Sequence, residues 1–297
     1  MRISYPLLID GGLSNELEKQ GCDLNHKLWS ARLLEKSHQP IIDAHLAYLE
    51  AGAGCITTAS YQATIPGFVA LGYDELQAAR FILKSVELAE IAKAQFEGPT
   101  PLIAASIGPY GAFLADGSEF RGNYDVDEEK LKRFHRYRIE LLDQSSADFL
   151  AFETIPSFIE VKVIAQLLEK TNKEAWISFS CKDEEHINDG TPIAKCVKYL
   201  ANHSNIFALG INCTAPKYIS SLLGIVKENC GDKRVVIYPN SGEVFDPITK
   251  EWSGLSDPKI FLKMSQEWLV QGADILGGCC RIGPSHIREM SSSFSNT

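Results

Sequence analysis

Residues 206–213, Ile-Phe-Ala-Leu-Gly-Ile-Asn-Cys, form a short apolar run that ends in polar residues, and a segment of helical length follows it. Amphipathic patterns such as Glu75–Phe96 and Asp127–Leu142 separate runs of this kind. Apolar strands that alternate with helices are typical of a parallel sheet covered by helices, and eight strands close a (β/α)8 barrel. We therefore predict an α/β fold, a single TIM-barrel domain over residues 1–297. The other seven runs are Leu7–Asp10, Cys55–Tyr61, Leu102–Gly108, Phe149–Ile155, Ala175–Cys181, Val235–Asn240 and Ile275–Cys280.

The segments between the runs support this division of the chain. Gly52 and Gly272 each stand a few residues before a predicted strand, where a left-handed helix cap belongs. The first three repeats are longer than the others, which predicts insertions, and Tyr110–Val126 is expected to form a lid over the barrel mouth. The rival fold is an open doubly wound sheet, but the sequence Asp-Gly-Gly at 10–12 lacks the G-x-G-x-x-G phosphate turn of that fold.

The composition excludes several classes of protein. Hydrophobic residues make up 45% of the 297 residues, too many for a disordered chain. The formal net charge is −9, so no basic surplus exists to neutralise a nucleic acid or an anionic membrane surface. No run reaches the roughly 18 apolar residues needed to cross a bilayer, and Met1–Ile9 does not resemble a signal peptide. We expect a cytoplasmic protein whose eight cysteines are reduced.

Three of the eight cysteines, Cys213, Cys279 and Cys280, fall at predicted strand ends, where a barrel carries its active site. Neighbouring residues of a strand point to opposite faces, so two adjacent thiols converge only where the backbone bends, and Gly277-Gly278 permits a bend. Three thiolates with an open fourth position are the pattern of a catalytic zinc site. The other cysteines are expected in loops or helices, or as small buried side chains: Cys22, Cys55, Cys181, Cys196 and Cys230.

Three alternatives to zinc stay open for these cysteines: buried apolar packing, a Cys279–Cys280 disulfide, and a nucleophilic cysteine. A reducing cytoplasm disfavours the disulfide, and a nucleophile needs a histidine base, which no predicted strand end supplies. The motifs H-E-x-x-H, G-x-x-x-x-G-K-[ST] and C-x-x-C are absent from the sequence. Histidine-based zinc hydrolysis, nucleotide hydrolysis and thioredoxin-type redox chemistry therefore lack their residues, and zinc is the favoured hypothesis.

A zinc ion with three thiolate ligands favours one kind of chemistry. It binds a substrate thiol as the thiolate and keeps that sulfur electron-rich, which suits alkyl transfer to a thiol. A thiol-bearing amino acid also needs partners for its ammonium and carboxylate groups. We expect Asp10 and Glu153 to receive the ammonium, and the backbone N–H groups of Gly11 and Gly12 to receive the carboxylate. The alternative is that both acids only bond to loop amides at the barrel mouth.

Nine segments together carry a resemblance to a known family: Leu28–Ala31, Thr58–Thr64, Ser106–Ala112, Leu114–Gly122, Phe152–Pro156, Asp189–Pro192, Gly210–Cys213, Tyr238–Glu243 and Gly277–Arg281. From Asp10 to Pro284 the chain resembles the homocysteine S-methyltransferases, and it looks like the branch that uses S-methylmethionine rather than betaine. The resemblance departs at Leu13-Ser14-Asn15, where relatives often have Thr before a Glu-Leu pair. It implies zinc on the three cysteines and homocysteine beside a pocket lined by Asp10, Gly11, Gly12, Thr57, Tyr61, Glu153 and Asn212.

The reaction that the resemblance implies is attack of the homocysteine thiolate on the methyl group of a sulfonium donor, which gives methionine. S-methylmethionine and S-adenosylmethionine are both possible donors, and a betaine-type donor or a selenocysteine acceptor is the alternative on the same barrel. Aromatic faces for a cationic donor are Tyr61, Tyr110, Phe113 and Phe120, which equally suit packing of the lid.

Two rival classes of function and the assembly state complete these expectations. A zinc-storing protein would bind the metal without turnover, and a barrel lyase or aldolase would need a lysine at a strand end, where none is predicted. The long C-terminal dimerisation extension of the betaine-using relatives is missing, because the chain stops about 17 residues after Cys280. We therefore expect a monomer that acts on small molecules.

Overall fold

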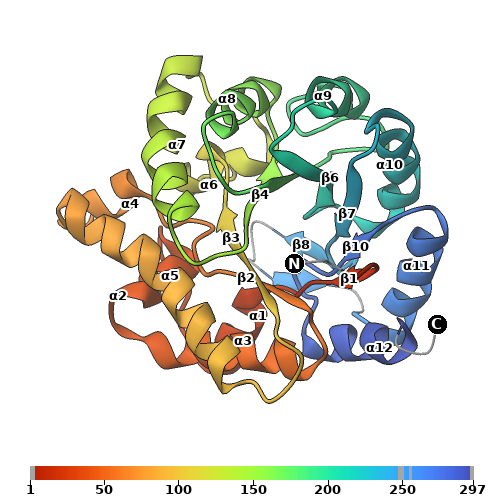
Figure 1. Ribbon diagram of the computed structural model, residues 1–297, viewed down its shortest axis with the longest axis horizontal. Helices are drawn as coiled ribbons and strands as arrows, with labels where there is room; N and C mark the ends of the chain where they lie inside the picture. Colours follow the sequence, from red (N-terminus) through yellow and green to blue (C-terminus); the bar gives the residue numbers. More distant parts are fainter. Residues whose placement is uncertain (1–3, 247–250, 254–255, 295–297) are drawn as a thin grey trace.

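The computed structural model describes residues 4–246, 251–253 and 256–294. Within them, eight parallel strands form one sheet in the order β1-β10-β7-β6-β5-β4-β3-β2. The two outer strands of this order meet through a parallel bridge between Ile9 and Cys55, and the Asp10 N–H donates to the Cys55 carbonyl over 3.1 Å. The sheet therefore curls into a barrel with helices around it, which confirms the predicted fold (Figure 1).

Each barrel strand overlaps one of the eight predicted runs, and the polar end of most runs lies beyond the strand. A two-stranded hairpin that we did not predict follows β7, and it consists of β8 (Val244–Asp246) and β9 (Glu251–Ser253). The barrel strands are β1 (Leu7–Leu8), β2 (Cys55–Thr57), β3 (Leu102–Ile107), β4 (Phe149–Ile155), β5 (Ala175–Phe179), β6 (Ile206–Asn212), β7 (Arg234–Tyr238) and β10 (Ile275–Leu276).

Helices follow the strands. The first three strand-helix units contain additional short helices, which confirms the predicted insertions. The two helical patterns predicted above correspond to α5 and α7, and the predicted lid segment holds α6 and η2. The helices are α1 (Leu13–Lys19), η1 (Trp29–Arg32), α2 (Leu33–Lys36), α3 (His38–Glu50), α4 (Ile65–Val69), α5 (Glu75–Gln95), α6 (Tyr110–Leu114), η2 (Ser118–Phe120), α7 (Glu128–Asp143), α8 (Phe158–Leu168), α9 (Ile193–Leu200), α10 (Pro216–Asn229), α11 (Pro258–Val270) and α12 (Pro284–Phe294).

Local sequence sets the ends of these helices. The Asp74 side chain accepts from the Gln77 N–H over 2.7 Å and the Gln77 side chain accepts from the Asp74 N–H over 3.0 Å, a capping box that starts α5. Gly52 and Gly272 follow α3 and α11 with φ of 100° and 104°, as predicted for left-handed caps. These ends turn the chain from a helix into the next strand.

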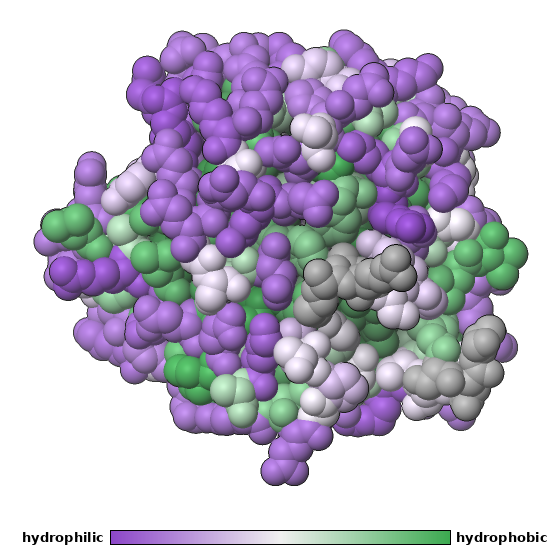
Figure 2. All heavy atoms as spheres, in the orientation of Figure 1, coloured by the Kyte–Doolittle hydropathy of each residue, from purple (hydrophilic) through white to green (hydrophobic). Residues whose placement is uncertain are grey.

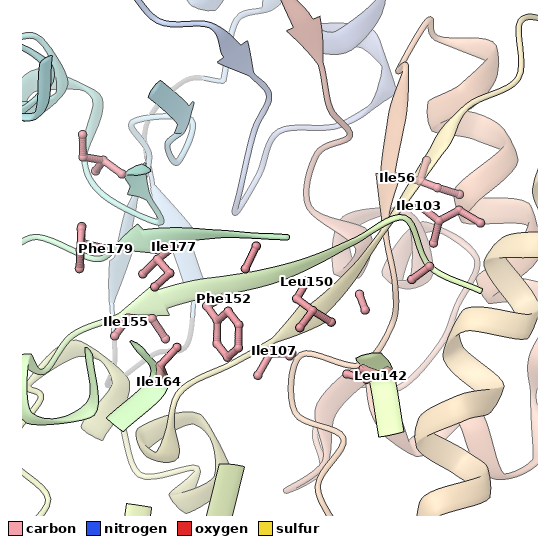
Figure 3. Close-up of a cluster of buried hydrophobic side chains, with 14 of the residues drawn as sticks. Ile56, Ile103, Ile107, Leu142, Leu150, Phe152, Ile155, Ile164, Ile177 and Phe179 are labelled. Atoms are coloured by element: carbon pink, nitrogen blue, oxygen red, sulfur yellow. The ribbon is translucent and has the colours of Figure 1, made fainter. Parts of the chain in front are cut away.

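The core has two layers. One cluster fills the barrel interior with side chains such as Ile9, Ala104, Trp176 and Val236. A larger cluster packs between the strands and the helices, and Figure 3 shows part of it around Phe152 and its isoleucine neighbours. Burying one such side chain fully contributes about 1.5–3 kcal/mol. The filled interior leaves the carboxyl ends of the strands as the place for a site.

The surface in the orientation of Figure 1 is covered mainly by hydrophilic side chains, with hydrophobic ones gathered at the left near α4 and at the right near α11 (Figure 2). Among the described residues, no helix is long and apolar enough to cross a membrane.

Candidate active site

A cavity of about 360 Å³ opens at the carboxyl ends of the barrel strands. Its lining comes from the loops after most of the strands, so residues far apart in the sequence meet there. All ten residues predicted for the site line this one cavity: Asp10, Gly11, Gly12, Thr57, Tyr61, Glu153, Asn212, Cys213, Cys279 and Cys280.

The sulfur atoms of Cys213, Cys279 and Cys280 converge on one side of the cavity. They lie within 4.8 Å of one another, and the Cys213 and Cys280 Sγ atoms are 3.8 Å apart. Sulfurs bound to one tetrahedral ion by bonds of about 2.3 Å lie about 3.8 Å from each other. Hydrogen bonds among the three thiols hold the pKa of Cys280 well below its usual range and raise the pKa values of Cys213 and Cys279 well above theirs. The group therefore fits a single metal ion that prefers thiolate ligands.

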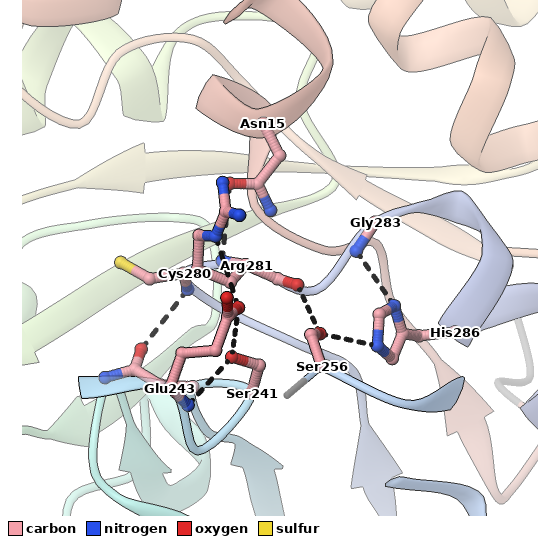
Figure 4. Close-up of polar contacts among 9 residues, drawn as sticks. Asn15, Ser241, Glu243, Ser256, Cys280, Arg281, Gly283 and His286 are labelled. Carbon is pink, nitrogen blue, oxygen red and sulfur yellow. Dashed lines mark hydrogen bonds and ion pairs between the residues drawn. The ribbon is translucent and has the colours of Figure 1, made fainter. Parts of the chain in front are cut away.

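The turn beyond β10 brings the two adjacent cysteines into the cavity. The Cys279 N–H donates to the Pro239 carbonyl over 2.8 Å, and the Cys280 N–H donates to the Asn240 side chain over 3.2 Å. Figure 4 shows Cys280 beside the Arg281–Glu243 ion pair, whose Nε and Oε2 atoms are 3.2 Å apart. The loop after β7 thus holds the backbone that carries both thiols.

We expected Gly277 and Gly278 to supply the bend of this turn, and the structure assigns them another role. The left-handed residue is Arg281, with φ of 67°. A Cβ atom on Gly278 would lie 2.0 Å from Ile282 Cγ2, and one on Gly277 would lie 2.3 Å from Ile9 Cγ1. The two glycines therefore permit close packing of the turn against β1 and Ile282.

The sequence departs from the family pattern at Leu13-Ser14-Asn15, and Asn15 of this segment contacts the same turn. Asn15 Oδ1 accepts from the Arg281 N–H over 3.3 Å, whereas the buried Asn15 Nδ2 has no partner among the described residues. Asn15 therefore supports the backbone after Cys280 from the α1 side (Figure 4).

Asp10 and Glu153 are buried in the cavity wall without a cationic partner among the described residues. Asp10 accepts from the Thr57 N–H over 2.7 Å and from its hydroxyl over 3.1 Å. Burial raises the pKa of Asp10 well above its usual value, and the negative charge of Glu153 raises it further. Burial also raises the pKa of Glu153 to about 7, although hydrogen bonds from Ser106 and Tyr238 lower it. A bound cation would stabilise the ionised form of both carboxyl groups and lower their pKa values.

Asn212 holds the backbone that presents Glu153. Its Oδ1 accepts from the Thr154 N–H over 2.7 Å and its Nδ2 donates to the Thr154 hydroxyl over 2.8 Å. Thr154 has φ of 61°, and the pairing of β4 with β5 shifts register between Phe152 and Ile155. The amide of Asn212 is thus occupied by protein contacts, which makes it a positioning residue in this structure.

The backbone N–H groups of Gly11 and Gly12 differ in whether a backbone carbonyl already accepts their hydrogen bond. The Gly12 N–H donates to the Ile282 carbonyl over 2.9 Å. The Tyr48 hydroxyl donates to the Gly12 and Ile282 carbonyls over 2.9 and 3.0 Å. Gly11 N–H makes no backbone hydrogen bond within the described part of the chain, so it is the amide available to a carboxylate.

The aromatic residues predicted to face a donor divide into two pairs. Tyr61 and Phe120 line the cavity. Tyr110 and Phe113 pack instead against Phe134, with ring centroids 4.9 and 5.4 Å away, so for them the alternative of lid packing holds. We did not predict three further lining residues, namely His26, Trp29 of η1 and Glu119 of η2. The sequence signal was weak because these residues do not directly follow a strand.

Backbone strain concentrates at this cavity. Among the described residues other than glycine, six have positive φ, and four of these line the cavity: Trp29, Ala115, Thr154 and Cys213. A fifth, Arg281, directly follows Cys280. Left-handed conformations of such residues cost about 1–3 kcal/mol each and cluster where function requires a particular geometry.

Comparison with known proteins agrees with this geometry. A family model described as homocysteine S-methyltransferase matches residues 7–294. Homocysteine S-methyltransferase YbgG of Bacillus subtilis is 47% identical over 297 aligned residues, which cover 97% of this chain and 94% of the relative. Selenocysteine Se-methyltransferase of Brassica oleracea is 43% identical, with 95% of this chain and 86% of the relative covered.

A solved structure extends the likeness to three dimensions. The metallated form of the homocysteine methyltransferase MmuM from Escherichia coli superposes with a TM-score of 0.86 at 41% identity, with 97% of this chain and 96% of that chain covered. The match in sequence, fold and coverage leaves one conclusion. The chain belongs to the homocysteine S-methyltransferase family.

Proposed function

We propose that this protein transfers a methyl group from a sulfonium donor to the thiol of L-homocysteine, which gives methionine. One observation carries the proposal: three cysteine sulfurs share one cavity with two buried carboxylates that have no cationic partner among the described residues. The sulfurs suit a thiol substrate held through a metal, and the carboxylates suit the ammonium group of an amino acid. Membership of the family and the methyltransferase names of the relatives point to the same reaction.

We propose Zn²⁺ as the ion, held by Cys213, Cys279 and Cys280. Three thiolates are soft ligands, and a site with three protein ligands leaves the fourth position to a substrate. When bound, the zinc ion would take the homocysteine sulfur as its thiolate and so supply a nucleophile at neutral pH.

The residues of the chain would hold the amino-acid part of homocysteine. Asp10 and Glu153 receive its ammonium group, and the Gly11 N–H donates to its carboxylate. Thr57 and Ser106 keep the two acids in place through the hydrogen bonds described above. Asn212 would act on the substrate indirectly, because it holds Thr154 and thereby orients the neighbouring Glu153.

The chemical step needs no further acid or base. The thiol proton passes to solvent before the reaction, a bond forms between the homocysteine sulfur and the methyl carbon, and the bond from that carbon to the donor sulfur breaks. Its electron pair stays on the donor sulfur, which leaves as a neutral thioether. We propose S-methylmethionine as the preferred donor, because the Tyr238–Glu243, Thr58–Thr64 and Leu114–Gly122 segments together resemble the branch that uses it.

Metal analysis and activity of one variant test this function. Protein purified without chelator should carry about one zinc per chain and methylate homocysteine. Cys279→Ser should lose the zinc and about a thousandfold or more in kcat/KM, since a catalytic metal supplies several kcal/mol. Cys22→Ser, which changes a cysteine outside the cavity, is the matched control and should keep both. An active protein without metal would overturn the zinc assignment.

A set of substrates separates the remaining alternatives. S-methylmethionine should be used ahead of S-adenosylmethionine and far ahead of betaine, with homocysteine as acceptor. Faster turnover with selenocysteine would instead align the chain with the Brassica relative.

We further propose that the barrel is one unit that acts as a monomer in the cytoplasm. All eight cysteines are free, as a reducing compartment requires. Sedimentation of the zinc-loaded protein tests the monomer.

A further inference from the structure

Glu119 lies on η2 and lines the same cavity as the cysteine cluster, but none of the roles assigned above uses it. Its segment has a fixed position. The Glu119 carbonyl accepts from the Ser180 hydroxyl and from the Asn188 side-chain amide, each over 3.4 Å. A Cβ atom on Gly111 would lie 2.5 Å from the Glu119 nitrogen, so η2 packs directly on α6. The backbone of Glu119 is therefore held by the protein on two sides.

The carboxylate of Glu119, in contrast, has no hydrogen-bond or ion-pair partner within the described part of the chain. The nearby cation, Arg121, bonds instead to the Asp116 carbonyl and the Ser118 hydroxyl over 3.3 and 3.2 Å. Burial raises the pKa of Glu119 to about 7, and the negative charge of Asp116 raises it further. Among the described residues, this largely buried carboxylate therefore has no positive partner, and burial of an unpaired charge is costly.

The aromatic lining around Glu119 suits a cation as well. Phe120 follows it in the cavity wall, and Tyr61 lies near enough for the charge of Glu119 to raise the pKa of its phenol. Trp29 stands edge-on to Tyr61 with ring centroids 6.2 Å apart. Ring faces and a carboxylate together attract an organic cation.

We propose that the Glu119 carboxylate pairs with the sulfonium centre of the methyl donor and so makes the site specific for positively charged donors. The inference rests on the proposed function, because it names the group that binds one of its two substrates. Asp10 and Glu153 face the ammonium of homocysteine, and Glu119 supplies a third negative charge for the second cation. Glu119 is thus a specificity-determining residue.

The charge change in the reaction gives this role a kinetic signature. The bond from the methyl carbon to the donor sulfur breaks, its electron pair remains on that sulfur, and the positive charge disappears as the new C–S bond forms. A carboxylate beside the sulfonium therefore stabilises the bound donor more than the transition state. Removing it should raise KM for the donor without lowering kcat.

Glu119→Gln in the zinc-loaded protein tests the inference. We expect KM for S-methylmethionine to rise about tenfold, as for loss of one charged contact, while kcat is unchanged or higher and KM for homocysteine stays within twofold. Glu119→Asp keeps the charge and should recover part of the affinity. Asp116→Asn is the matched control, because Asp116 belongs to the same segment, pairs with Arg121 and lies outside the cavity lining.

Calorimetry gives a readout without turnover. Glu119→Gln should weaken binding of S-methylmethionine about tenfold and leave binding of methionine, the neutral product, within twofold. Equal loss for both compounds, or an unchanged KM for the donor in an active enzyme, would overturn the role of Glu119 alone. Absence of homocysteine methylation by the wild-type protein with any sulfonium would overturn the proposed function itself.

Discussion

Two groups of buried charges lie at the same end of the barrel, and they differ in where their partners come from. The first joins α7 to α8: Arg138 donates to the Gly108 carbonyl over 2.6 Å and lies 3.2 Å from His135 Nδ1, and His135 Nε2 lies 2.7 Å from Glu160 Oε1. The second consists of Asp10, Glu153 and Glu119 in the cavity wall, three carboxylates without a cation among the described residues.

The charges of the first group stabilise the protein around the cavity, whereas those of the second group are available to a bound ligand. The Arg138–Glu160 network is balanced within the chain, and it holds backbone that leads into the cavity. Glu160 accepts from the Tyr110 N–H over 2.6 Å, and Arg138 reaches the Tyr61 and Ala63 carbonyls over 3.4 Å. The three cavity carboxylates have no cationic partner among the described residues, and the proposed ammonium and sulfonium groups would bring two positive charges to them. Uncompensated burial of charge is costly, so its presence at a cavity indicates a cationic ligand.

Breaking the balanced network should have the largest effect. Arg138→Met removes the positive charge that reaches Glu160 through His135 and removes the donor to the Gly108 carbonyl. Removal of one partner from a buried charge network costs about 3–5 kcal/mol. Urea unfolding should show this loss in the free energy of unfolding. Arg136→Met changes an exposed arginine of the same helix and is the control, with an expected change below about 0.5 kcal/mol. A loss below about 1 kcal/mol for Arg138→Met would mean that the network is not structural.

Removing a cavity carboxylate should act in the opposite direction on stability. Glu153→Gln should raise KM for homocysteine about a hundredfold, since the ammonium loses a buried charged partner. The same change should stabilise the protein without substrate. The pKa of Glu153 is raised to about 7, so its folded form resists ionisation and stability falls as pH rises from about 4.5 to 7.

Thermal or urea unfolding between pH 5 and pH 8 measures this second effect. The wild type should lose up to about 3 kcal/mol that Glu153→Gln keeps. If Glu153→Gln were less stable than the wild type at pH 8, Glu153 would stabilise the protein as the Arg138–Glu160 network does. The distinction between the two groups of charges would then be wrong.

The sequence predicts the second group better than the first. Asp10, Glu153 and the three cysteines lie at or near the carboxyl ends of apolar runs, and the barrel rule places such residues together at one mouth. His135 and Arg138 lie three residues apart on a helix, a spacing that any solvated helix shows, and their partner Glu160 is 22 residues further on. Glu119 escaped prediction for a related reason: it belongs to an inserted loop, where no periodic pattern assigns a direction to a side chain.

His45 sharpens the comparison, because it shows that lack of a partner alone does not mark a ligand site. It lies on α3, fully buried, with neither ring nitrogen bonded among the described residues, and it does not line the cavity. A buried histidine avoids the cost of a buried charge when it stays neutral, and burial lowers the pKa of His45 to about 4. The unfolded chain gains a proton below pH 6.5 and the folded chain does not, so stability is lost as pH falls from 6.5 towards 4.

His45→Leu should therefore leave the protein about 2 kcal/mol more stable than the wild type at pH 5, relative to the difference between the two at pH 8. The comparison of two pH values cancels any change in packing, since the imidazole is neutral in both states at pH 8. Unfolding in urea at the two pH values measures the effect, and kcat/KM at pH 8 should stay unchanged because His45 lies outside the cavity. If the variant kept the full acid sensitivity of the wild type, or if it lost donor or homocysteine affinity, His45 would belong with the ligand-binding charges, and a buried group without a partner would have to be treated as part of the site wherever it lies.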